Sequence, residues 1–521
     1  MSDERVFRLA RPKAKGLLRI IFSRLIIILL LLAFQVALMV SLYNWLNEFI
    51  PHFSAVRTLF TAAMIVYLFN NSMDSTAKLT WMFIIAIVPL PGAALLLFTQ
   101  TNAGHRRIKR RVSELTEETK DAIPQPEAPA HELSRDGSGT DDLSKYLKRS
   151  GCFPVFGNTD VTYFPSGEEK FEALLRELRA AERFIFLEYF IIEEGYMWGE
   201  VLKILTEKAR QGVDVRVLYD GMCEVNTLPV NYKKLLRGLG IKAKAFSPIR
   251  PAVSSHYNYR DHRKILVVDG RVAFNGGVNL ADEYINRKVR FGHWKDTAVM
   301  LRGEAVKSFT LMFLQMWNID EKEPVFPPEL LDSEPVPEAE GYVLPYGDCP
   351  LDTDKVGETV YMDILARATD YVHIMTPYLI LDGELETAIK YAAQRGVDVK
   401  LILPGIPDKK MAYALAKSHY RALLEAGVKI YEYTPGFVHA KVAVCDGKKA
   451  VVGTINLDYR SLYHHFECAT YMYKTPCIAD IERDFQDTLV RCREVTAETV
   501  KRERVYYKLM GGLMKFVAPL M

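Results

Sequence analysis

A pattern of five residue types occurs twice in the sequence, in the stretches HRKILVVDGRVAFNGGVN (262–279) and HAKVAVCDGKKAVVGTIN (439–456). Each stretch has a histidine, a lysine, an aspartate, a glycine and an asparagine at offsets 0, 2, 7, 14 and 17. The apolar run after each His-x-Lys predicts a short buried strand, on which the histidine and the lysine face the same side. Two unrelated strand–turn segments with buried histidines are the alternative, and five matched positions argue against it. The chain therefore contains a duplicated catalytic half.

These residue types suit phosphoryl chemistry. An imidazole acts as a nucleophile or a proton donor near neutral pH, while lysine and asparagine side chains can bind the oxygens of a phosphate. Displacement at a phosphodiester needs two histidines, one that attacks and one that protonates the leaving alcohol, and each stretch supplies one. We therefore expect the two stretches to form one site. Its predicted catalytic residues are His262, Lys264, Asp269, His439, Lys441 and Asp446, with Asn279 and Asn456 as phosphate-binding residues. We interpret Asp269 and Asp446 mainly as structural, because each ends its motif strand at an Asp-Gly turn.

The two stretches resemble the paired HKD motifs of the phospholipase D superfamily. Four further segments resemble bacterial cardiolipin synthase, at residues 376–378, 395–399, 427–437 and 453–461, and the likeness runs from about residue 80 to the C-terminus. This resemblance implies a phosphatidyl transfer between two molecules of phosphatidylglycerol, through a phosphohistidine and without a cofactor, that yields cardiolipin and glycerol. It favours His262 as the nucleophile and His439 as the general acid and then base. The two motifs are too alike for the residues alone to assign these roles.

The resemblance also implies an acidic residue that orients each histidine. Glu467 occupies this place after the second motif, and Asp296 in a Trp-Lys-Asp-Thr stretch fits it after the first. A surface or salt-bridged carboxylate is the alternative for each. His465 stands where the family usually has asparagine, so the role of this position stays open. We predict no metal site, since His464 and His465 are adjacent rather than spaced as ligands and no Cys/His cluster is present.

The duplication extends beyond the motifs. Residues 209–218 and 393–402 match each other, and each predicts a helix end, a glycine stop and a strand of β-branched residues. Apolar strands expected at 184–192 and 371–378 precede them and complete a strand–helix–strand order in each half. The predicted fold class is α/β, with two duplicated phospholipase D-like halves whose mainly parallel sheets face each other.

The N-terminal region is predicted to be membrane-embedded. Residues 25–42 are almost wholly aliphatic and long enough to cross a bilayer core of about 30 Å. A second uncharged stretch, 79–104, contains Pro-Leu-Pro-Gly at 89–92 and is expected to be kinked or broken there. A third, 58–71, is short enough for a short span or a re-entrant arm. Residues 1–104 are therefore expected to hold two to three hydrophobic helices.

Charge predicts the orientation in the membrane. Basic residues precede the first span and cluster again at 106–111, so both flanks are expected on the cytoplasmic side, with an even number of crossings. The seven cysteines form no C-x-x-C pair and agree with a reducing compartment. We expect a multi-pass protein of the cell membrane with a cytoplasmic catalytic part. The formal charge of only +3 gives no sign of nucleic-acid binding.

The remaining segments are predicted as connections. Residues 105–150 are basic, then acidic and Pro-containing, and predict a flexible tether. The halves are expected at 151–320 and 342–497, separated by a Pro- and Glu-rich linker at 321–341. Residues 498–521 are basic and amphipathic, and either lie on an anionic membrane surface or pack as a terminal helix on the core.

Three other functions share parts of this pattern. A phospholipase D that hydrolyses lipids uses the same motifs, and exclusion of water separates it from a transferase. A non-catalytic membrane scaffold would not need ten intact motif residues. A phosphatidylserine synthase or nuclease of the same superfamily fits the hydrophobic segments and the second-half likeness less well. The oligomeric state is open.

Overall fold

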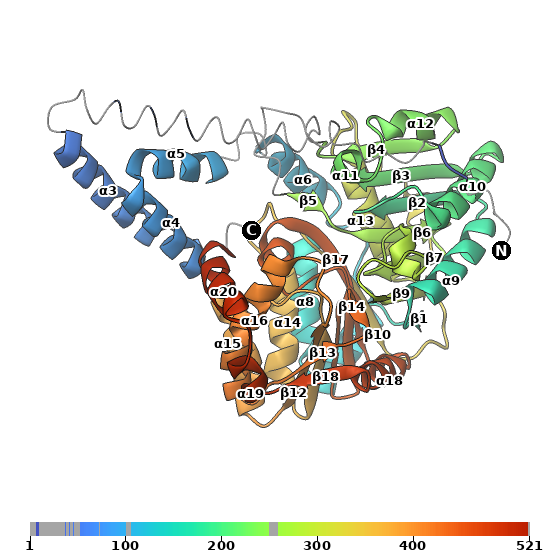
Figure 1. The fold of residues 1–521 in the computed structure, drawn as a ribbon. Helices are drawn as coiled ribbons and strands as arrows, with labels where there is room; N and C mark the ends of the chain where they lie inside the picture. The colour runs from blue at the N-terminus through green and yellow to red at the C-terminus, as the bar shows by residue number, and fades with distance from the viewer. Residues whose placement is uncertain are drawn as a thin grey trace.

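The computed structural model describes residues 7–9, 37, 41, 45, 53–71, 73–100, 106–248 and 259–518. In these residues the chain forms two α/β halves and a group of N-terminal helices that projects away from them (Figure 1).

Each half is built on one sheet, and the two sheets have the same strand order. The first runs β1-β9-β7-β6-β2-β3-β4 and the second runs β10-β17-β16-β15-β11-β12-β13, with β18 added at its edge. The strands of the first half are β1 (Thr159–Phe164), β2 (Phe184–Tyr189), β3 (Asp214–Asp220), β4 (Lys242–Phe246), β6 (Lys264–Val268), β7 (Val272–Gly276) and β9 (Ala298–Gly303). Those of the second are β10 (Tyr342–Asp348), β11 (Tyr371–Met375), β12 (Asp398–Pro404), β13 (Lys429–Tyr433), β15 (Val442–Cys445), β16 (Lys449–Gly453), β17 (His465–Tyr473) and β18 (Cys492–Val495). The predicted duplication is confirmed.

The prediction of mainly parallel sheets is wrong. Strands β2, β3 and β4 are parallel, as are β11, β12 and β13, but the remaining pairings along each sheet are antiparallel. The strand–helix–strand units give the parallel pairs. Each motif strand, β6 or β15, instead returns through a tight Asp-Gly turn, and a hairpin can only be antiparallel. The sheets are mixed.

Helices cover both faces of the first sheet because side chains on a strand alternate between faces. Phe184 and Phe186 of β2 belong to the core cluster that contains Phe313 of α13, while Ile185 and Leu187 belong to the cluster of α9 and α10. The helical segments of this half are α9 (Gly167–Arg179), α10 (Tyr196–Arg210), α11 (Cys223–Asn226), α12 (Tyr232–Gly238), the 3-10 helix η1 (Asp282–Ile285) and α13 (Val306–Asn318). Those of the second half are α14 (Val356–Arg367), α15 (Gly383–Gln394), α16 (Lys410–Glu425), α17 (Tyr459–Tyr463) and α18 (Ile478–Leu489). The cluster around α13 continues into the second half, so the halves share a core.

Two short pairings join the halves directly. Strand β8 (His293–Lys295) of the first half lies parallel to β14 (Gly436–Val438) of the second. Strand β5 (Arg260–Asp261) of the first half lies parallel to the start of β17 in the second. In each pairing one strand ends directly before a motif histidine, β5 before His262 and β14 before His439.

The N-terminal helices are α3 (Phe53–Phe69), α4 (Ser75–Ile87) and α5 (Pro89–Gln100). The predicted segment 58–71 forms most of α3, and the segment 79–104 is divided between α4 and α5 at the Pro-Leu-Pro-Gly stretch, where a break was expected. The predicted span at 25–42 lies outside the described residues except for residues 37 and 41. Of the helices that the structure describes, none combines the length and the apolar character needed to cross a membrane.

The predicted flexible tether is instead folded. Residues 106–151 contain α6 (Arg106–Glu118), α7 (Glu127–Asp136) and α8 (Thr140–Gly151). Three leucines on α7 and α8 belong to the shared core, Leu133, Leu143 and Leu147, and Leu115 of α6 is also buried. The proline and the glycines mark helix ends, since Pro126 precedes α7 while Gly137 and Gly139 separate α7 from α8. Charge and proline content predicted disorder, but the sparse leucines between the charges bury enough apolar surface to fold the segment.

The predicted linker and the C-terminal helix also pack against the rest of the protein. Residues 321–341 contain the 3-10 helix η2 (Pro328–Leu330), and Arg183 donates to the Glu329 carbonyl at 2.6 Å. After α19 (Ala497–Lys501), helix α20 (Val505–Val517) packs on α16 through Gly511, whose Cα lies so near the Ala414 carbonyl that a Cβ would approach to 2.5 Å. The C-terminal helix therefore packs on the protein, which was one of the two predicted alternatives for residues 498–521.

Candidate active site

The two short strand pairings between the halves position both motif histidines. His262 follows β5, and its backbone N–H donates to the Phe466 carbonyl of β17 at 2.9 Å. His439 follows β14, and its N–H donates to the Lys295 carbonyl of β8 at 2.7 Å. Residue Glu467 comes one position after Phe466, and Asp296 comes one after Lys295. Each histidine therefore meets a carboxylate from the opposite half.

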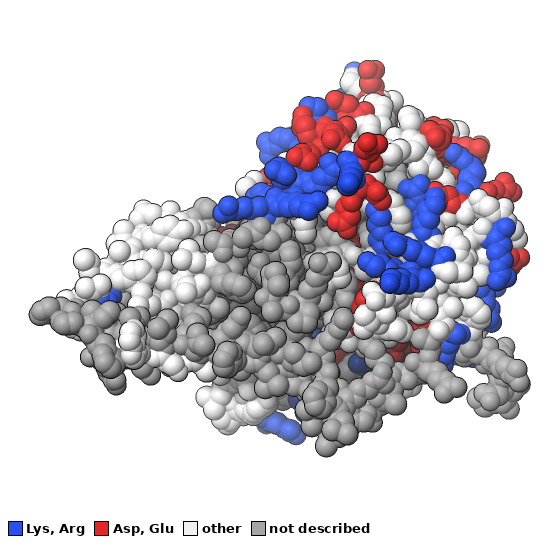
Figure 2. Space-filling view, turned by 90° about the horizontal axis from the view of Figure 1, so that it is seen from above, with Lys and Arg blue, Asp and Glu red and all other residues white. Residues whose placement is uncertain are grey.

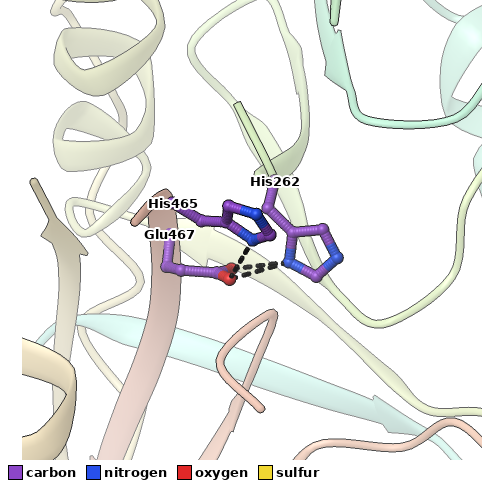
Figure 3. A group of neighbouring side chains, drawn as sticks. All are labelled: His262, His465 and Glu467. Atoms are coloured by element: carbon purple, nitrogen blue, oxygen red, sulfur yellow. Dashed lines mark hydrogen bonds and ion pairs between the residues drawn. The ribbon is translucent and has the colours of Figure 1, made fainter. Parts of the chain in front are cut away.

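His262 and Glu467 form the first pair (Figure 3). The Nδ1 atom of His262 lies 2.8 and 2.9 Å from the two carboxylate oxygens of Glu467, and Thr454 donates its hydroxyl to the same carboxylate. All three side chains are buried. A carboxylate on Nδ1 directs the other ring nitrogen, Nε2, away from the pair as the reactive atom.

His439 and Asp296 form the second pair. Nδ1 of His439 lies 2.7 Å from Oδ2 of Asp296, and Oδ1 of Asp296 accepts the Thr297 N–H at 2.9 Å. The ammonium of Lys441 lies 2.9 Å from the same Nδ1. Since a neutral ring nitrogen cannot donate to Asp296 and accept from Lys441 at once, we assign the proton to the bond with the carboxylate. The contact with Lys441 then brings a positive charge beside the ring without a hydrogen bond to it.

Both motif lysines are buried beside their own histidines. The ammonium of Lys264 donates to the His262 carbonyl at 2.6 Å, and that of Lys441 donates to the His439 carbonyl. Burial lowers the pKa of Lys264 to about 8 and that of Lys441 to about 7, against the opposing effect of the site carboxylates. The site holds two cations that are costly to bury and are ready to accept an anion.

The charges of the two halves act on each other. Burial is the main cause that holds the pKa of His262 well below its usual value, and Lys264, Lys441 and His439 lower it further. Burial, with Lys441, lowers the pKa of His439 to about 4. Both rings are therefore neutral at pH 7 in the empty site, as a nucleophile requires. The structure therefore brings the histidine and the lysine of both motifs together.

Asp269 and Asp446 have the same structural role in both halves. The Asp269 carboxylate accepts the backbone N–H groups of residues 182, 183 and 184 at 2.9, 2.8 and 2.9 Å, and Asp446 accepts those of residues 369, 370 and 371 at 2.8, 2.9 and 2.8 Å. Both aspartates have positive φ, 57° and 52°, at the turn that follows the motif strand. These contacts support the structural interpretation.

The last two motif positions differ in what surrounds them. A Cβ on Gly276 would lie 2.5 Å from Cα of Ala298, and one on Gly453 would lie 2.3 Å from Cβ of Ala469, so the neighbouring strand requires glycine at both. Asn279 accepts the Ile191 N–H at 3.0 Å and donates to the Tyr284 hydroxyl at 2.7 Å, which ties it to the scaffold. Asn456 is buried, and its side-chain oxygen has no partner among the described residues. Phosphate binding by either asparagine stays a prediction.

Sequence reasoning missed two aromatic or polar neighbours of the histidines. Thr454, which donates to Glu467, corresponds to Gly277 in the first half, where a Cβ would lie 2.0 Å from the Asp296 carboxylate. The ring centroid of Trp294 lies 5.3 Å from that of His439. Aligning the two copies residue by residue beyond the five shared positions exposes the Gly277/Thr454 difference.

The geometry also bears on metal binding. His262, His465 and Glu467 offer three ligand atoms within 4.8 Å of one another (Figure 3). The lysine charges that reach His262 and His465 oppose a cation there. We therefore describe the group as a histidine–carboxylate cluster, and the absence of a metal stays a prediction.

Comparison with known proteins agrees with this geometry. A family model described as cardiolipin synthase, PLD-like domain, matches residues 174–317 and 361–489, one match in each half. A protein of Streptococcus mutans serotype c, described as uncharacterized, is 58% identical over 457 residues, or 88% of this chain and 99% of its own length. A cardiolipin synthase 2 of Bacillus anthracis is 34% identical over 465 residues, or 89% of this chain and 90% of its own.

A solved structure shares the fold. The phosphatidylserine synthase of Haemophilus influenzae Rd KW20 matches with a TM-score of 0.55 and 16% identity, over 73% of this chain and 97% of that one. At 16% identity this likeness shows the fold alone, whereas the family is shown by the relative that is 34% identical over 89% of this chain. The chain belongs to the cardiolipin synthase family of proteins with phospholipase D-like domains.

Proposed function

We propose that this protein is a cardiolipin synthase that transfers a phosphatidyl group from one phosphatidylglycerol to another. The observation that carries the proposal is the pair of buried histidines, each held at Nδ1 by a carboxylate from the opposite half, with a lysine beside each. Two oppositely placed histidines and two cations are what a two-step displacement at phosphorus requires.

In the first step, Nε2 of His262 attacks the phosphorus of the donor lipid. A phosphorus–nitrogen bond forms, the bond from phosphorus to the glycerol headgroup breaks, and His439 gives its Nε2 proton to the leaving oxygen. Burial and, after it, the lysine charges hold the pKa of His439 low; the negative phosphodiester offsets the lysine charges, so His439 can carry this proton once lipid is bound. Glu467 stabilises the positive charge that develops on His262.

In the second step, a hydroxyl of the second phosphatidylglycerol attacks the phosphohistidine. His439, now neutral, takes the hydroxyl proton, and the phosphorus–nitrogen bond breaks to give cardiolipin. One phosphodiester replaces another, so no nucleotide is needed and excess glycerol reverses the reaction. Lys264 and Lys441 balance the charge on the phosphate oxygens in both steps.

We propose that the enzyme works at an anionic membrane surface, with its N-terminal region in the membrane. Helices α3, α4 and α5 expose large apolar side chains. In Figure 2 the described atoms of the projecting region are mostly white, whereas Lys, Arg, Asp and Glu side chains are spread over the halves. Helix α20 adds more beside α4: the Thr80 hydroxyl donates to the Phe516 carbonyl at 2.7 Å, and Leu509 and Leu513 are 71% and 60% exposed. A bilayer would cover these apolar side chains.

Purified protein with phosphatidylglycerol as the only lipid tests the proposal. We expect cardiolipin and glycerol in equal amounts, and loss of both products in His262→Ala and in His439→Ala. Phosphatidic acid as the main product would show a hydrolytic phospholipase D instead.

A substrate with a p-nitrophenol leaving group separates the two histidines. Because this leaving group needs no protonation, His439→Ala should release one burst of p-nitrophenol and retain the lipid covalently, whereas His262→Ala should release none. A burst only in His262→Ala would exchange the two roles.

A further inference from the structure

Glu467 has a second histidine beside it that the mechanism above does not use. Nδ1 of His465 lies 3.6 Å from Oε1 of Glu467, and its ring centroid lies 5.2 Å from that of His262, so the two imidazoles flank one carboxylate (Figure 3). His465 and Glu467 are two residues apart on β17 and therefore point to the same side of the strand. His465 is 6% exposed, and neither ring nitrogen has a hydrogen-bond partner among the described residues. A buried imidazole without partners is costly, which suggests a use for it.

The other half of the site lacks this arrangement. Trp294 precedes Asp296 by two residues, as His465 precedes Glu467, and its ring lies against His439 as His465 lies against His262. An indole cannot take up a proton. The two carboxylates also differ in their pKa values. Interactions with His439 and Lys441 hold the pKa of Asp296 below its usual value despite burial. Burial instead raises the pKa of Glu467 well above its usual value. The His262–Glu467 pair therefore tends to hold one proton more than the His439–Asp296 pair.

That extra proton obstructs the first step. When the His262–Glu467 pair carries two protons, there are two ways to place them. Either Nε2 of His262 is protonated and cannot attack, or Glu467 is a neutral acid, which stabilises the developing charge on His262 poorly. With one proton, on Nδ1 of His262, Nε2 is free and Glu467 is an anion. We propose that His465 is a positioning residue for His262 that accepts this second proton from Glu467 at Nδ1 when the phosphodiester binds. No proton leaves the site, and the transfer needs only a short approach of the 3.6 Å pair.

The charges around His465 decide when the transfer occurs. Its charged neighbours are Arg460 of α17, Lys264 of β6 and Arg260 of β5, with His464 next to it on the chain, and Glu467 is its ion-pair partner. Burial and then these cations hold the pKa of His465 well below its usual value. A bound phosphodiester adds negative charge beside Lys264, which favours a protonated His465 only in the complex. This inference rests on the proposed function.

The variant that tests it is His465→Asn, which keeps a donor of similar reach but cannot titrate. Its matched control is His464→Asn, which removes the neighbouring histidine, whose ring centroid lies 6.2 Å from that of Tyr259. Without His465 the second proton must leave to solvent, so the acid limb of kcat should move to higher pH by about one unit, which is about tenfold in kcat below the limb. The plateau of kcat and the KM should stay within about twofold, and His464→Asn should match the wild type. A uniform loss at every pH, or an unmoved limb, would refute the role.

A second measurement does not depend on turnover. The infrared carboxyl band of Glu467, assigned by its loss in Glu467→Gln, reports whether this side chain is an acid or an anion. A non-reactive phosphonate analogue of phosphatidylglycerol should convert the acid band to the carboxylate band in the wild type and in His464→Asn, but not in His465→Asn at the same pH. If the band changes as expected while no cardiolipin forms, the proposed function fails and the proton transfer stands. If cardiolipin forms and His465→Asn shows the wild-type conversion, only the role of His465 fails.

Discussion

At the residue scale, each motif copy contains residues proposed for catalysis and residues that support the fold. The sequence separates these two kinds only in part. The histidines and lysines could be predicted because few other functions need that pair twice. Their crossed partners, Glu467 for His262 and Asp296 for His439, could be named as acidic residues, but the sequence holds no signal for which half each one serves. That assignment depends on β5 pairing with β17 and β8 with β14, and these pairings are contacts between residues far apart in the chain.

The crossed carboxylates should control the histidine tautomers. Glu467→Gln and Asp296→Asn keep the volume but offer an amide that fixes the wrong tautomer, and an equivalent change in a serine protease triad costs about 10⁴ in kcat. We expect losses of that order, with the covalent burst from the p-nitrophenol substrate impaired in Glu467→Gln and kept in Asp296→Asn. Equal bursts in the two variants would contradict the crossed assignment.

The motif aspartates should matter for stability instead. Asp446→Ala and Asp269→Ala each leave three backbone donors without their carboxylate, at an expected cost of about 2–4 kcal/mol in the free energy of unfolding. Thermal unfolding should show a lower midpoint, while the folded fraction keeps its kcat. A variant that is inactive at an unchanged midpoint would place the aspartate in the chemistry.

The lysines predict the alkaline side of the pH profile. Their pKa values of about 7 and about 8 lie below the ordinary value, so each ammonium is lost as pH rises through those values in the free enzyme. Since the ammonium is the form that binds phosphate, kcat/KM should fall with rising pH from near neutrality. Lys441→Arg stays charged and, if it retains activity, should move this limb to higher pH. A flat alkaline profile in the wild type would count against phosphate binding by the lysines.

At the element scale, local patterns predicted strand–helix–strand units and hairpins, but the way they combine into mixed sheets depended on turn geometry. Helices α6, α7 and α8 show the limit most clearly, because their charge and proline content predicted a tether while a few leucines decided the outcome. Leu133 and Leu147 are fully buried in the shared core. A few apolar residues within a charged segment predict folded helices only weakly, because the sequence does not show whether an apolar surface is present for them to pack against.

The folded segment gives a direct test. Leu147→Ala should lower the free energy of unfolding by about 2–5 kcal/mol, as expected for a buried leucine. The exposed Lys148→Ala on the same helix is the control and should change it little. Limited proteolysis should also leave residues 106–151 intact in the wild type. Rapid cleavage there, with no effect of Leu147→Ala, would restore the flexible tether.

At the scale of the whole molecule, charge predicts the side of the membrane on which the site lies. Basic residues flank the N-terminal hydrophobic region on both sides, which favours a cytoplasmic catalytic part. The native cysteines that the structure describes are buried or half-buried. They should be removed so that a single new thiol at an exposed position can report the side.

The exposed linker residue Glu338 is suited to this, since it lies on the surface between the halves' sequences. In the cysteine-free background, Glu338→Cys should resist a membrane-impermeant maleimide in intact cells and react once the membrane is permeabilised. The reaction after permeabilisation is the control for accessibility of the thiol. Labelling in intact cells would place the site outside and require an odd number of crossings, so the N-terminal hydrophobic segments would then have to cross once or three times rather than twice.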